Sequence, residues 1–136
     1  MTGDAPRVLV VDDDVPICEL LEVAFADEGW DVQVRMRSQQ ALDLLGRWTA
    51  DVILLDLRMP EMDAETFLAR CRGAMHREIP VLLFSASSNL DHHAARLGLR
   101  DVVAKPSDID VLCTTVRRVM TQEKVGQVSS VVRRRS

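Results

Sequence analysis

Short apolar segments alternate with helix-like segments along almost the whole chain, and this alternation limits the fold more than any other feature. Four runs rich in Val, Leu and Ile (residues 8–11, 52–55, 81–84 and 102–104) are continuously apolar. Continuous runs of this length are typical of strands that are buried on both faces of a parallel sheet. A fifth segment, residues 32–36, alternates apolar and polar side chains, which predicts a half-covered edge strand.

The segments between these runs have helical spacing. Residues 17–25 place apolar side chains at i, i+3, i+4, i+7 and i+8, and residues 109–120 repeat this stripe. Ser38, Asp63 and Asp108 occupy the positions expected of helix N-caps. Repeated alternation of strand and helix forms a parallel sheet with helices on both faces. Because a closed barrel of this kind needs eight such units and about 250 residues, we predict an open, five-stranded α/β fold.

Composition narrows the class of protein further. Of 136 residues, 47% are hydrophobic and 28% are charged, which suits one domain with its own core. No apolar run approaches the roughly 20 residues of a membrane span, and the N-terminus lacks a signal-peptide pattern. The three cysteines form no C-x-x-C pair, so we expect neither a disulfide framework nor a zinc site, and a cytoplasmic location. Few aromatic residues and no Tyr argue against base-stacking nucleic-acid modules.

Charge is distributed unevenly along the chain. The net charge is −4, yet residues 117–136 contain six basic residues and one acidic residue. We predict an N-terminal lead at residues 1–6, a folded domain at residues 7–124, and a basic, flexible tail at residues 125–136. The roughly twelve residues of that tail are too few for a helix-turn-helix module, so we expect no nucleic-acid binding within this chain.

Polar side chains follow four of the predicted strands. The first strand ends in Asp12, Asp13 and Asp14, the third in Asp56, and the fourth in Ser85. The fifth ends in a lysine at position 105, one of two lysines in a chain whose other 15 cations are arginines. Each residue alone has a plain structural explanation as a cap or turn residue. Because parallel strands bind ligands beyond their carboxyl ends, however, the set converges on one edge of the sheet.

The chemistry of this set is that of phosphoryl transfer. Neighbouring carboxylates repel one another and need a counter-charge, and a few carboxylates with retained waters suit Mg²⁺. An aspartate in such a site is able to attack phosphorus and form an acyl phosphate. The metal ion and a nearby ammonium group would neutralise the charge on the transferred group. Lys105 is the candidate ammonium, and Ser85 is a candidate hydrogen-bond donor to that group.

Four segments together resemble the receiver domain of two-component response regulators. These are VLVVDDD at residues 8–14, DLRMPEMD at 56–63, FSA at 84–86 and VAKP at 103–106, in this order. The resemblance spans about residues 7–124, which is nearly the whole chain. It implies a flavodoxin-like (βα)5 fold with strand order 2-1-3-4-5.

The resemblance also implies a role for each site residue. Asp56 matches the phospho-acceptor, Asp13 the direct Mg²⁺ ligand, and Asp12 its partner ligand. The backbone carbonyl of Arg58 would complete the protein's share of the metal shell. Asp14 has no assigned duty in the family, and we interpret it as a helix cap or first-turn acid.

The remaining matches concern the response to phosphorylation. Ser85 matches the switch hydroxyl, and Lys105 matches the lysine that pairs with the phosphoryl group. Pro106 would follow a cis peptide bond. The implied function is that of a phospho-acceptor switch, not of an enzyme that turns over a free substrate. A histidine kinase or a phosphotransfer protein would be the donor, and an unknown downstream protein would bind the fourth helix–fifth strand–fifth helix face, where a homodimer is also conceivable.

Three features depart from the family pattern. Ala64 stands where a glycine is usual, so the preceding loop is expected to differ in shape. Val102 stands where an aromatic residue is usual, so coupling between the switch hydroxyl and a rotating ring cannot operate in the usual way. Arg58 and Ser87 occupy two variable positions beside the pocket, where the family tunes the lifetime of the phosphoryl group.

Two other functions remain open from sequence. A pseudo-receiver would use the same fold for protein binding alone and would never carry phosphate, and the departures at Ala64 and Val102 favour it slightly. A haloacid-dehalogenase-type phosphatase would use Asp12-x-Asp14 as its nucleophile motif, but it would leave the segment that begins at Asp56 unexplained.

Overall fold

A computed structural model describes residues 5–74 and 78–125. Strands and helices alternate without exception in this part of the chain, in the order β1 (Arg7–Val11), α1 (Val15–Asp27), β2 (Asp31–Arg35), α2 (Ser38–Leu45), β3 (Val52–Leu55), α3 (Ala64–Ala74), β4 (Val81–Ser85), α4 (Leu90–Leu97), β5 (Asp101–Ala104) and α5 (Ile109–Val125). Strands lie where the apolar runs predict them, and helices occupy the segments between them.

The five strands form one parallel sheet in the order β2-β1-β3-β4-β5. This arrangement confirms the open five-stranded α/β fold and the strand order that the sequence resemblance implied. Strand β1 pairs with β2 on one side and with β3 on the other. The strand order therefore reverses between β1 and β3. The carboxyl ends of β1 and β3 are therefore adjacent, which places their loops at the switch point of the sheet.

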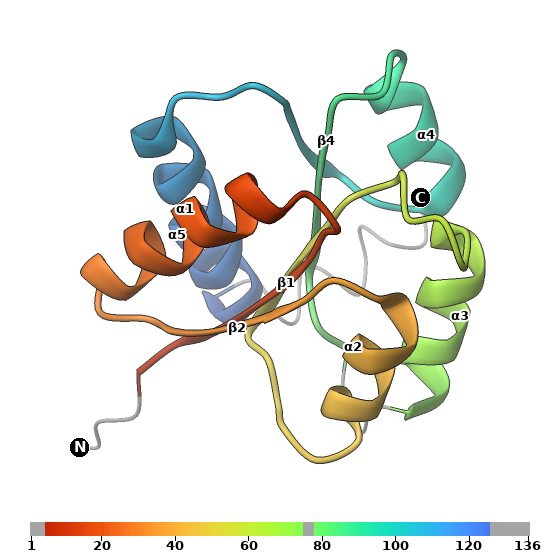
Figure 1. The fold of residues 1–136 in the computed structure, drawn as a ribbon, viewed down its shortest axis with the longest axis horizontal. Coiled ribbons are helices and arrows are strands. Elements are labelled where there is room, and N and C mark those ends of the chain that lie inside the picture. The colour runs from red at the N-terminus through yellow and green to blue at the C-terminus, as the bar shows by residue number, and fades with distance from the viewer. Residues whose placement is uncertain (1–4, 75–77, 126–136) are drawn as a thin grey trace.

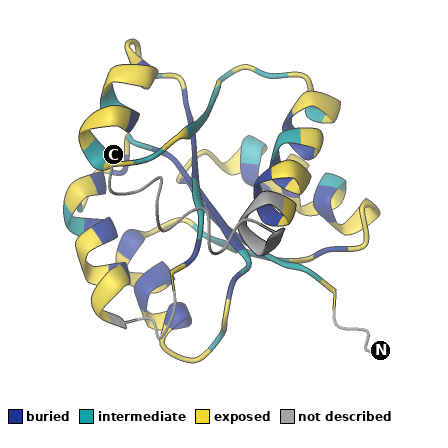
Figure 2. Cartoon of the chain, turned by 180° about the vertical axis from the view of Figure 1, so that it is seen from behind, coloured by how far each residue is buried: buried dark blue, intermediate teal, exposed yellow. Residues whose placement is uncertain are grey.

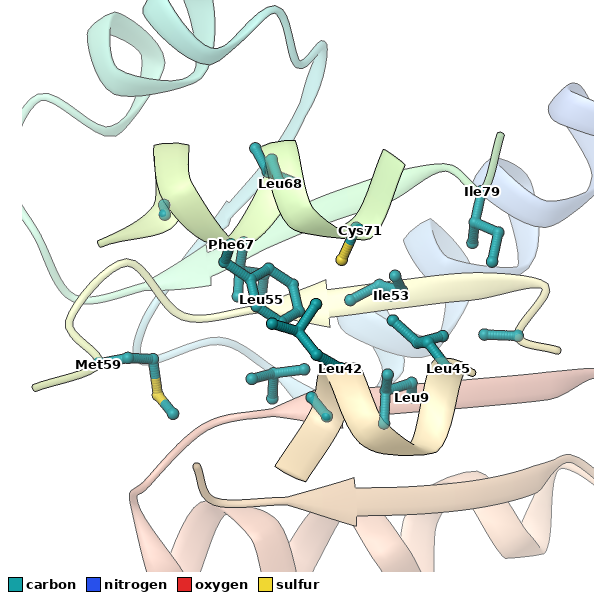
Figure 3. Packing of buried hydrophobic residues seen from close by; sticks show 14 of the residues in the cluster. Leu9, Leu42, Leu45, Ile53, Leu55, Met59, Phe67, Leu68, Cys71 and Ile79 are labelled. Carbon is teal, nitrogen blue, oxygen red and sulfur yellow. The ribbon is translucent and has the colours of Figure 1, made fainter. Parts of the chain in front are cut away.

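Helices cover both faces of this sheet (Figure 1). Helices α1 and α5 enclose one hydrophobic cluster, which includes Val10, Phe25 and Val116. Helices α2, α3 and α4 enclose the other cluster on the opposite face. Figure 3 shows part of this second cluster, where Leu42 of α2 and Phe67 of α3 meet Leu55 of β3. The strands alternate their side chains between the two clusters.

The two edge strands differ from the central three in burial. Every residue of β3 is buried, whereas Val102 and Val103 of β5 are only partly buried and Ala104 is exposed (Figure 2). The prediction that residues 102–104 are buried on both faces is therefore wrong, because β5 lies at the sheet edge. The half-covered edge strand is confirmed in β2, although it ends at Arg35 and leaves Met36 exposed.

Helix starts follow the predicted caps in two of three cases. The Asp63 carboxylate accepts a hydrogen bond from the Thr66 N–H at 2.7 Å, and the Asp108 carboxylate accepts one from the Asp110 N–H at 2.8 Å. The prediction for Ser38 is wrong, because Ser38 is the first residue of α2 and Arg37 precedes it as the N-cap. Arg37 makes no side-chain capping bond, and a residue from another loop takes that role, as described below.

The remaining sequence predictions concern the ends of the chain and its cysteines. The tail predicted at residues 125–136 lies outside the described residues except for Val125, which ends α5. Residues 1–4 of the predicted lead also lie outside them. Among the described helices, none combines the length and the apolar character needed to cross a bilayer. All three cysteines are buried free thiols.

Candidate functional site

Three carboxylates meet at the carboxyl edge of the sheet. Asp12 and Asp13 directly follow β1, and Asp56 directly follows the neighbouring β3. An oxygen from each lies within 4.8 Å of an oxygen from each of the others. Asp12 and Asp56 are buried, whereas Asp13 is exposed. Parallel pairing of β1 with β3 therefore forms the acidic cluster that the sequence predicts.

Lys105 lies over this cluster from the end of β5. Its ammonium nitrogen lies 2.7 Å from Oδ2 of Asp12 and 3.5 Å from Oδ2 of Asp56. The same nitrogen lies 5.4 Å from the centroid of the Phe84 ring, whose face attracts a cation. The peptide bond between Lys105 and Pro106 is cis, as the resemblance implied. One ammonium thus contacts two of the three carboxylates.

Burial and ion pairing shift the pKa values of Asp12 and Lys105 in opposite directions. Burial raises the pKa of Asp12, and the hydrogen bond from Lys105 offsets only part of this effect. For Lys105, burial alone would lower the pKa, but the pairing with Asp12 and Asp56 outweighs it and the net pKa is raised. Lys105 is therefore charged at neutral pH, and this one ammonium group faces two buried carboxyl groups.

Backbone groups shape the two acidic loops. The Asp14 N–H donates to Oδ1 of Asp12 at 3.0 Å, and the Arg58 N–H donates to Oδ1 of Asp56 at 3.2 Å. The side chain of Asp14 accepts a hydrogen bond from the Ile17 N–H and is the N-cap of α1. This confirms the interpretation of Asp14 as a helix cap.

The contact between Ser85 and the site residue Lys105 is made by backbone atoms. Ser85 is fully buried at the end of β4, and its carbonyl accepts a hydrogen bond from the Lys105 N–H at 3.0 Å. Its hydroxyl lies 3.2 Å from the hydroxyl of Ser87, in the loop that follows. The structure thus brings Asp12, Asp13, Asp56 and Lys105 together directly, whereas the Ser85 hydroxyl is paired with Ser87.

Sequence similarity identifies the family to which this site belongs. The family model for the response regulator receiver domain matches residues 8–117, which is most of the chain. The chain belongs to the response regulator receiver domain family. The matched residues contain β1 from Val8 onward, β2 to β5, the whole acidic cluster and Lys105.

Relatives and solved structures agree with this assignment. The receiver domain is 34% identical over 122 residues to the transcriptional regulatory protein ZraR and 36% identical over 116 residues to the regulatory protein AtoC, both from Escherichia coli K12. These matches cover 88% and 84% of this chain, but it spans only about a quarter of either relative (27% and 25%). The receiver domain of the Francisella response regulator 1452 is 30% identical, with a TM-score of 0.76 over 86% of this chain and 98% of that one.

The donor set of this receiver domain fits a magnesium ion. Three carboxylates offer the hard oxygen ligands that Mg²⁺ prefers, and the exposed Asp13 gives the cluster access to solvent. The ammonium of Lys105 already balances part of the buried charge of Asp12, which shows that these carboxylates need a positive partner. Receiver domains bind Mg²⁺ at an acidic site of this kind.

Two of the three departures from the family pattern, Ala64 and Val102, have defined places in the structure. Ala64 is the buried first residue of α3, and among the described non-glycine residues Asn89 alone has a positive φ. A glycine is therefore not needed at position 64, and α3 starts normally at Ala64 after the Asp63 cap. Val102 is partly buried and packs against the cluster under α4, together with Leu97 and Leu99.

Two residues contact the site that sequence reasoning missed. The Cys18 thiol of α1 donates to the Asp12 carbonyl at 3.2 Å, and burial raises the pKa of Cys18 to about 12. The thiol is therefore protonated at neutral pH and is a structural contact, not a nucleophile. Phe84 lies beside the Lys105 ammonium. Cys18 belongs to no pattern that would single it out, and Phe84, although it lies in the FSA segment at residues 84–86, resembles an ordinary core position.

Proposed function

We propose that this receiver domain accepts a phosphoryl group on Asp56 from a histidine kinase or a phosphotransfer protein. One observation supports this above all others: the buried Asp56 carboxylate lies beside Asp12, Asp13 and the ammonium of Lys105. A carboxylate in this setting has a cation beside it and further acidic groups able to hold a metal ion. Those are the requirements of phosphoryl transfer to an aspartate.

In the proposed step, one oxygen of Asp56 attacks the phosphorus of a phosphohistidine. The new O–P bond gives an acyl phosphate, the N–P bond breaks, and the donor histidine keeps the bond's electron pair. Lys105 supplies positive charge beside the acceptor, 3.5 Å from Oδ2 of Asp56. The Arg58 N–H, which donates to Oδ1 of Asp56, orients the carboxylate. Hydrolysis later returns Asp56 to its carboxylate form.

Asp12, Asp13, Asp56 and the backbone carbonyl of Arg58 would hold Mg²⁺. When bound, Mg²⁺ supplies charge neutralisation at the oxygens of the transferred group. The exposed position of Asp13 suits a ligand that meets a solvated ion first. Asp12 would exchange part of its pairing with Lys105 for the metal, which frees the ammonium to pair with the phosphoryl group.

Phosphorylation would then act as a switch. The dianionic group attracts Lys105 and the hydroxyl of Ser85, and Ser85 would have to exchange its pairing with Ser87 for a bond to the phosphoryl group. Both residues lie at strand ends that lead into the α4–β5–α5 face, where a downstream protein or a second copy of this chain would bind. ZraR and AtoC are regulatory proteins; by analogy, a downstream output is the expected target of the switch.

A pseudo-receiver that never carries phosphate is the second candidate, and only Val102 favours it. The phosphatase alternative has lost its support, because it needs the Asp14 carboxylate at the reacting centre. That carboxylate instead caps α1 through Ile17. The family to which the chain belongs provides no reason to retain the phosphatase reading.

Beryllofluoride, a phosphoryl mimic, tests the proposal without a kinase. We expect NMR resonances of residues around Asp56 and Lys105 to shift when beryllofluoride and Mg²⁺ are both present, beyond the change that Mg²⁺ alone produces, and not to shift with beryllofluoride alone. Asp56→Asn should remove the shifts, whereas the exposed control Asp27→Asn, at the end of α1, should retain them. Absence of any Mg²⁺-dependent complex in the wild-type protein would favour the pseudo-receiver.

A further inference from the structure

The loop of residues 57–63 joins Asp56 to α3, and it is fastened to the rest of the protein at several points. At its start, the Arg58 N–H donates to Asp56. Met59 is buried in the hydrophobic cluster between α2 and α3, as Figure 3 shows. At its end, Asp63 caps α3 through the Thr66 N–H. Apolar packing therefore holds the inner side of this loop.

A polar contact fastens the outer side of the same loop to α2. The carboxylate of Glu61 accepts a hydrogen bond from the Ser38 N–H at 3.2 Å through Oε1. Its other oxygen, Oε2, lies 3.3 Å from Nε of Arg37. One side chain thus contacts both the N-cap residue and the first residue of α2. The Glu61 side chain is three-quarters buried in doing so, with 25% of its surface exposed.

Helix α2 depends on this contact because it has no cap of its own. Arg37 occupies the N-cap position and offers no side-chain acceptor. Ser38, the residue type that usually caps a helix, is shifted into the first turn. Its hydroxyl is buried and, among the described residues, has no hydrogen-bond partner. The Glu61 carboxylate therefore supplies, from a different loop, the acceptor and the negative charge that a helix N-terminus favours.

We infer that Glu61 is a positioning residue for the phosphorylation site. By anchoring the loop to α2, it fixes the segment that contains Arg58 between two attachments, Asp56 at one end and α2 at the other. The Arg58 carbonyl, proposed above as a metal ligand, lies in this segment. Groups that orient metal ligands typically change metal affinity by about 10–100-fold when they are lost. This inference rests on the proposed function, since it assigns Glu61 a role toward the same metal site.

Hydrogen exchange tests the anchoring without any metal. In Glu61→Ala we expect the Ser38 amide to exchange at least about tenfold faster in NMR measurements without Mg²⁺, with smaller increases along residues 57–62. Glu61→Gln keeps an oxygen acceptor for the Ser38 N–H and should retain most of the protection. Glu65→Ala, which removes an exposed glutamate in the first turn of α3, is the matched control and should leave the exchange of Ser38 unchanged. Unchanged exchange in Glu61→Ala would overturn the inference.

Magnesium affinity tests the positioning role itself. We expect calorimetric titration with MgCl₂ to give a Kd about tenfold weaker for Glu61→Ala than for the wild type, with Glu61→Gln restoring most of the affinity. Arg37→Ala should change the Kd less than twofold, because the Arg37 side chain is 66% exposed and such ion pairs contribute little. A lower melting temperature with an unchanged Kd would mean that Glu61 is only structural, which contradicts the positioning role. A wild-type protein that binds no Mg²⁺ would instead contradict the proposed function, and with it the role assigned to Glu61.

Discussion

The acidic pocket and the α4–β5 region differ in how many contacts hold their residues in place. In the pocket, three carboxylates lie within 4.8 Å of one another, an ammonium group contacts two of them, and backbone N–H groups orient the same two. In the α4–β5 region, α4 has two buried residues, Leu90 and Ala94, and begins after Asn89, which adopts a left-handed conformation without a side-chain cap. A valine occupies position 102, where receiver domains usually have an aromatic ring.

This difference distinguishes the region proposed to accept the phosphoryl group from the region proposed to signal phosphorylation to a partner. Charges hold the pocket together, and Asp12, Asp56 and Lys105 each have a defined partner. Helix α4 rests on little apolar contact, and the partly buried Val102 beside it gives no ring that could rotate between two positions. We therefore expect changes in the pocket to affect phosphorylation and folding strongly, and changes around α4 to affect the local stability of that helix while leaving phosphorylation intact.

The largest effect should follow the loss of Lys105. In Lys105→Met, Asp12 and Asp56 are left buried without the ammonium group that contacts both of them. Breaking a buried ion pair costs about 3 kcal/mol or more, so the free energy of unfolding in EDTA should fall by about that amount. Urea denaturation measures this change.

A titration with Mg²⁺ then separates charge balance from packing in the same variant. Added Mg²⁺ should restore part of the lost stability of Lys105→Met, because it binds the carboxylates only in the folded state. A variant whose unfolding free energy is within 0.5 kcal/mol (roughly the effect of an ordinary surface substitution) of the wild type would contradict the described role of Lys105.

A smaller effect is expected in the other region. Leu90→Ala removes one of the two buried side chains of α4, and such a truncation costs about 2 kcal/mol at a site with few neighbours. We expect faster amide exchange in residues 90–97, while the initial rate of phosphorylation by acetyl phosphate changes less than about twofold. A phosphorylation rate that falls in parallel with the stability of α4 would remove the distinction between the two regions.

Substitution of Arg58 should have a still smaller effect, limited to the lifetime of the phosphoryl group on Asp56. Arg58 is exposed, its N–H donates to Asp56, and a guanidinium group at this position is able to shield an acyl phosphate from water. In Arg58→Ala we expect the phosphoryl group to decay about threefold faster, which corresponds to less than about 1 kcal/mol in the barrier. Intact-protein mass measured at intervals after removal of acetyl phosphate gives this rate, and an unchanged rate would contradict the prediction.

The smallest effect concerns pH. Burial raises the pKa of Asp12 above its ordinary value of 3.8, so the folded protein holds this proton more tightly than the unfolded chain. The penalty of ionising Asp12 is absent at low pH and grows as the pH rises above 3.8. Without Mg²⁺, Asp12→Asn should therefore gain stability relative to the wild type as the pH rises from 3.8 towards neutrality. Urea denaturation across this range tests it, and a constant difference between the two proteins would contradict it.

Sequence was sufficient to predict the sheet, because four continuous apolar runs and one alternating run already define buried and edge strands. It failed for β5, whose composition matches a central strand although its place in the sheet is at the edge. It also failed for Ser38, because the cap of α2 comes from Glu61, 23 positions away in the chain. Local sequence patterns do not predict contacts of this kind, because such contacts depend on how the loop after β3 and the start of α2 are placed in space.

The candidate site shows the same limit. The residues at the strand ends could be predicted because parallel strands bring their carboxyl ends to one edge. The partners of those residues could not: the pairing of Lys105 with Asp12 at 2.7 Å, closer than with Asp56, depends on the path of the chain after β5. The contact of Cys18 with the Asp12 carbonyl follows from how α1 packs against β1, which no motif records.

The most direct measurement is the intact mass of the protein after incubation with acetyl phosphate, with and without Mg²⁺. We expect one added phosphoryl group in the wild-type protein with Mg²⁺, and none in Asp56→Asn or without the metal. An adduct that persists in Asp56→Asn but disappears in Asp12→Asn would identify Asp12, not Asp56, as the acceptor. A wild-type protein that forms no adduct under any of these conditions would contradict the proposal that Asp56 is a phospho-acceptor.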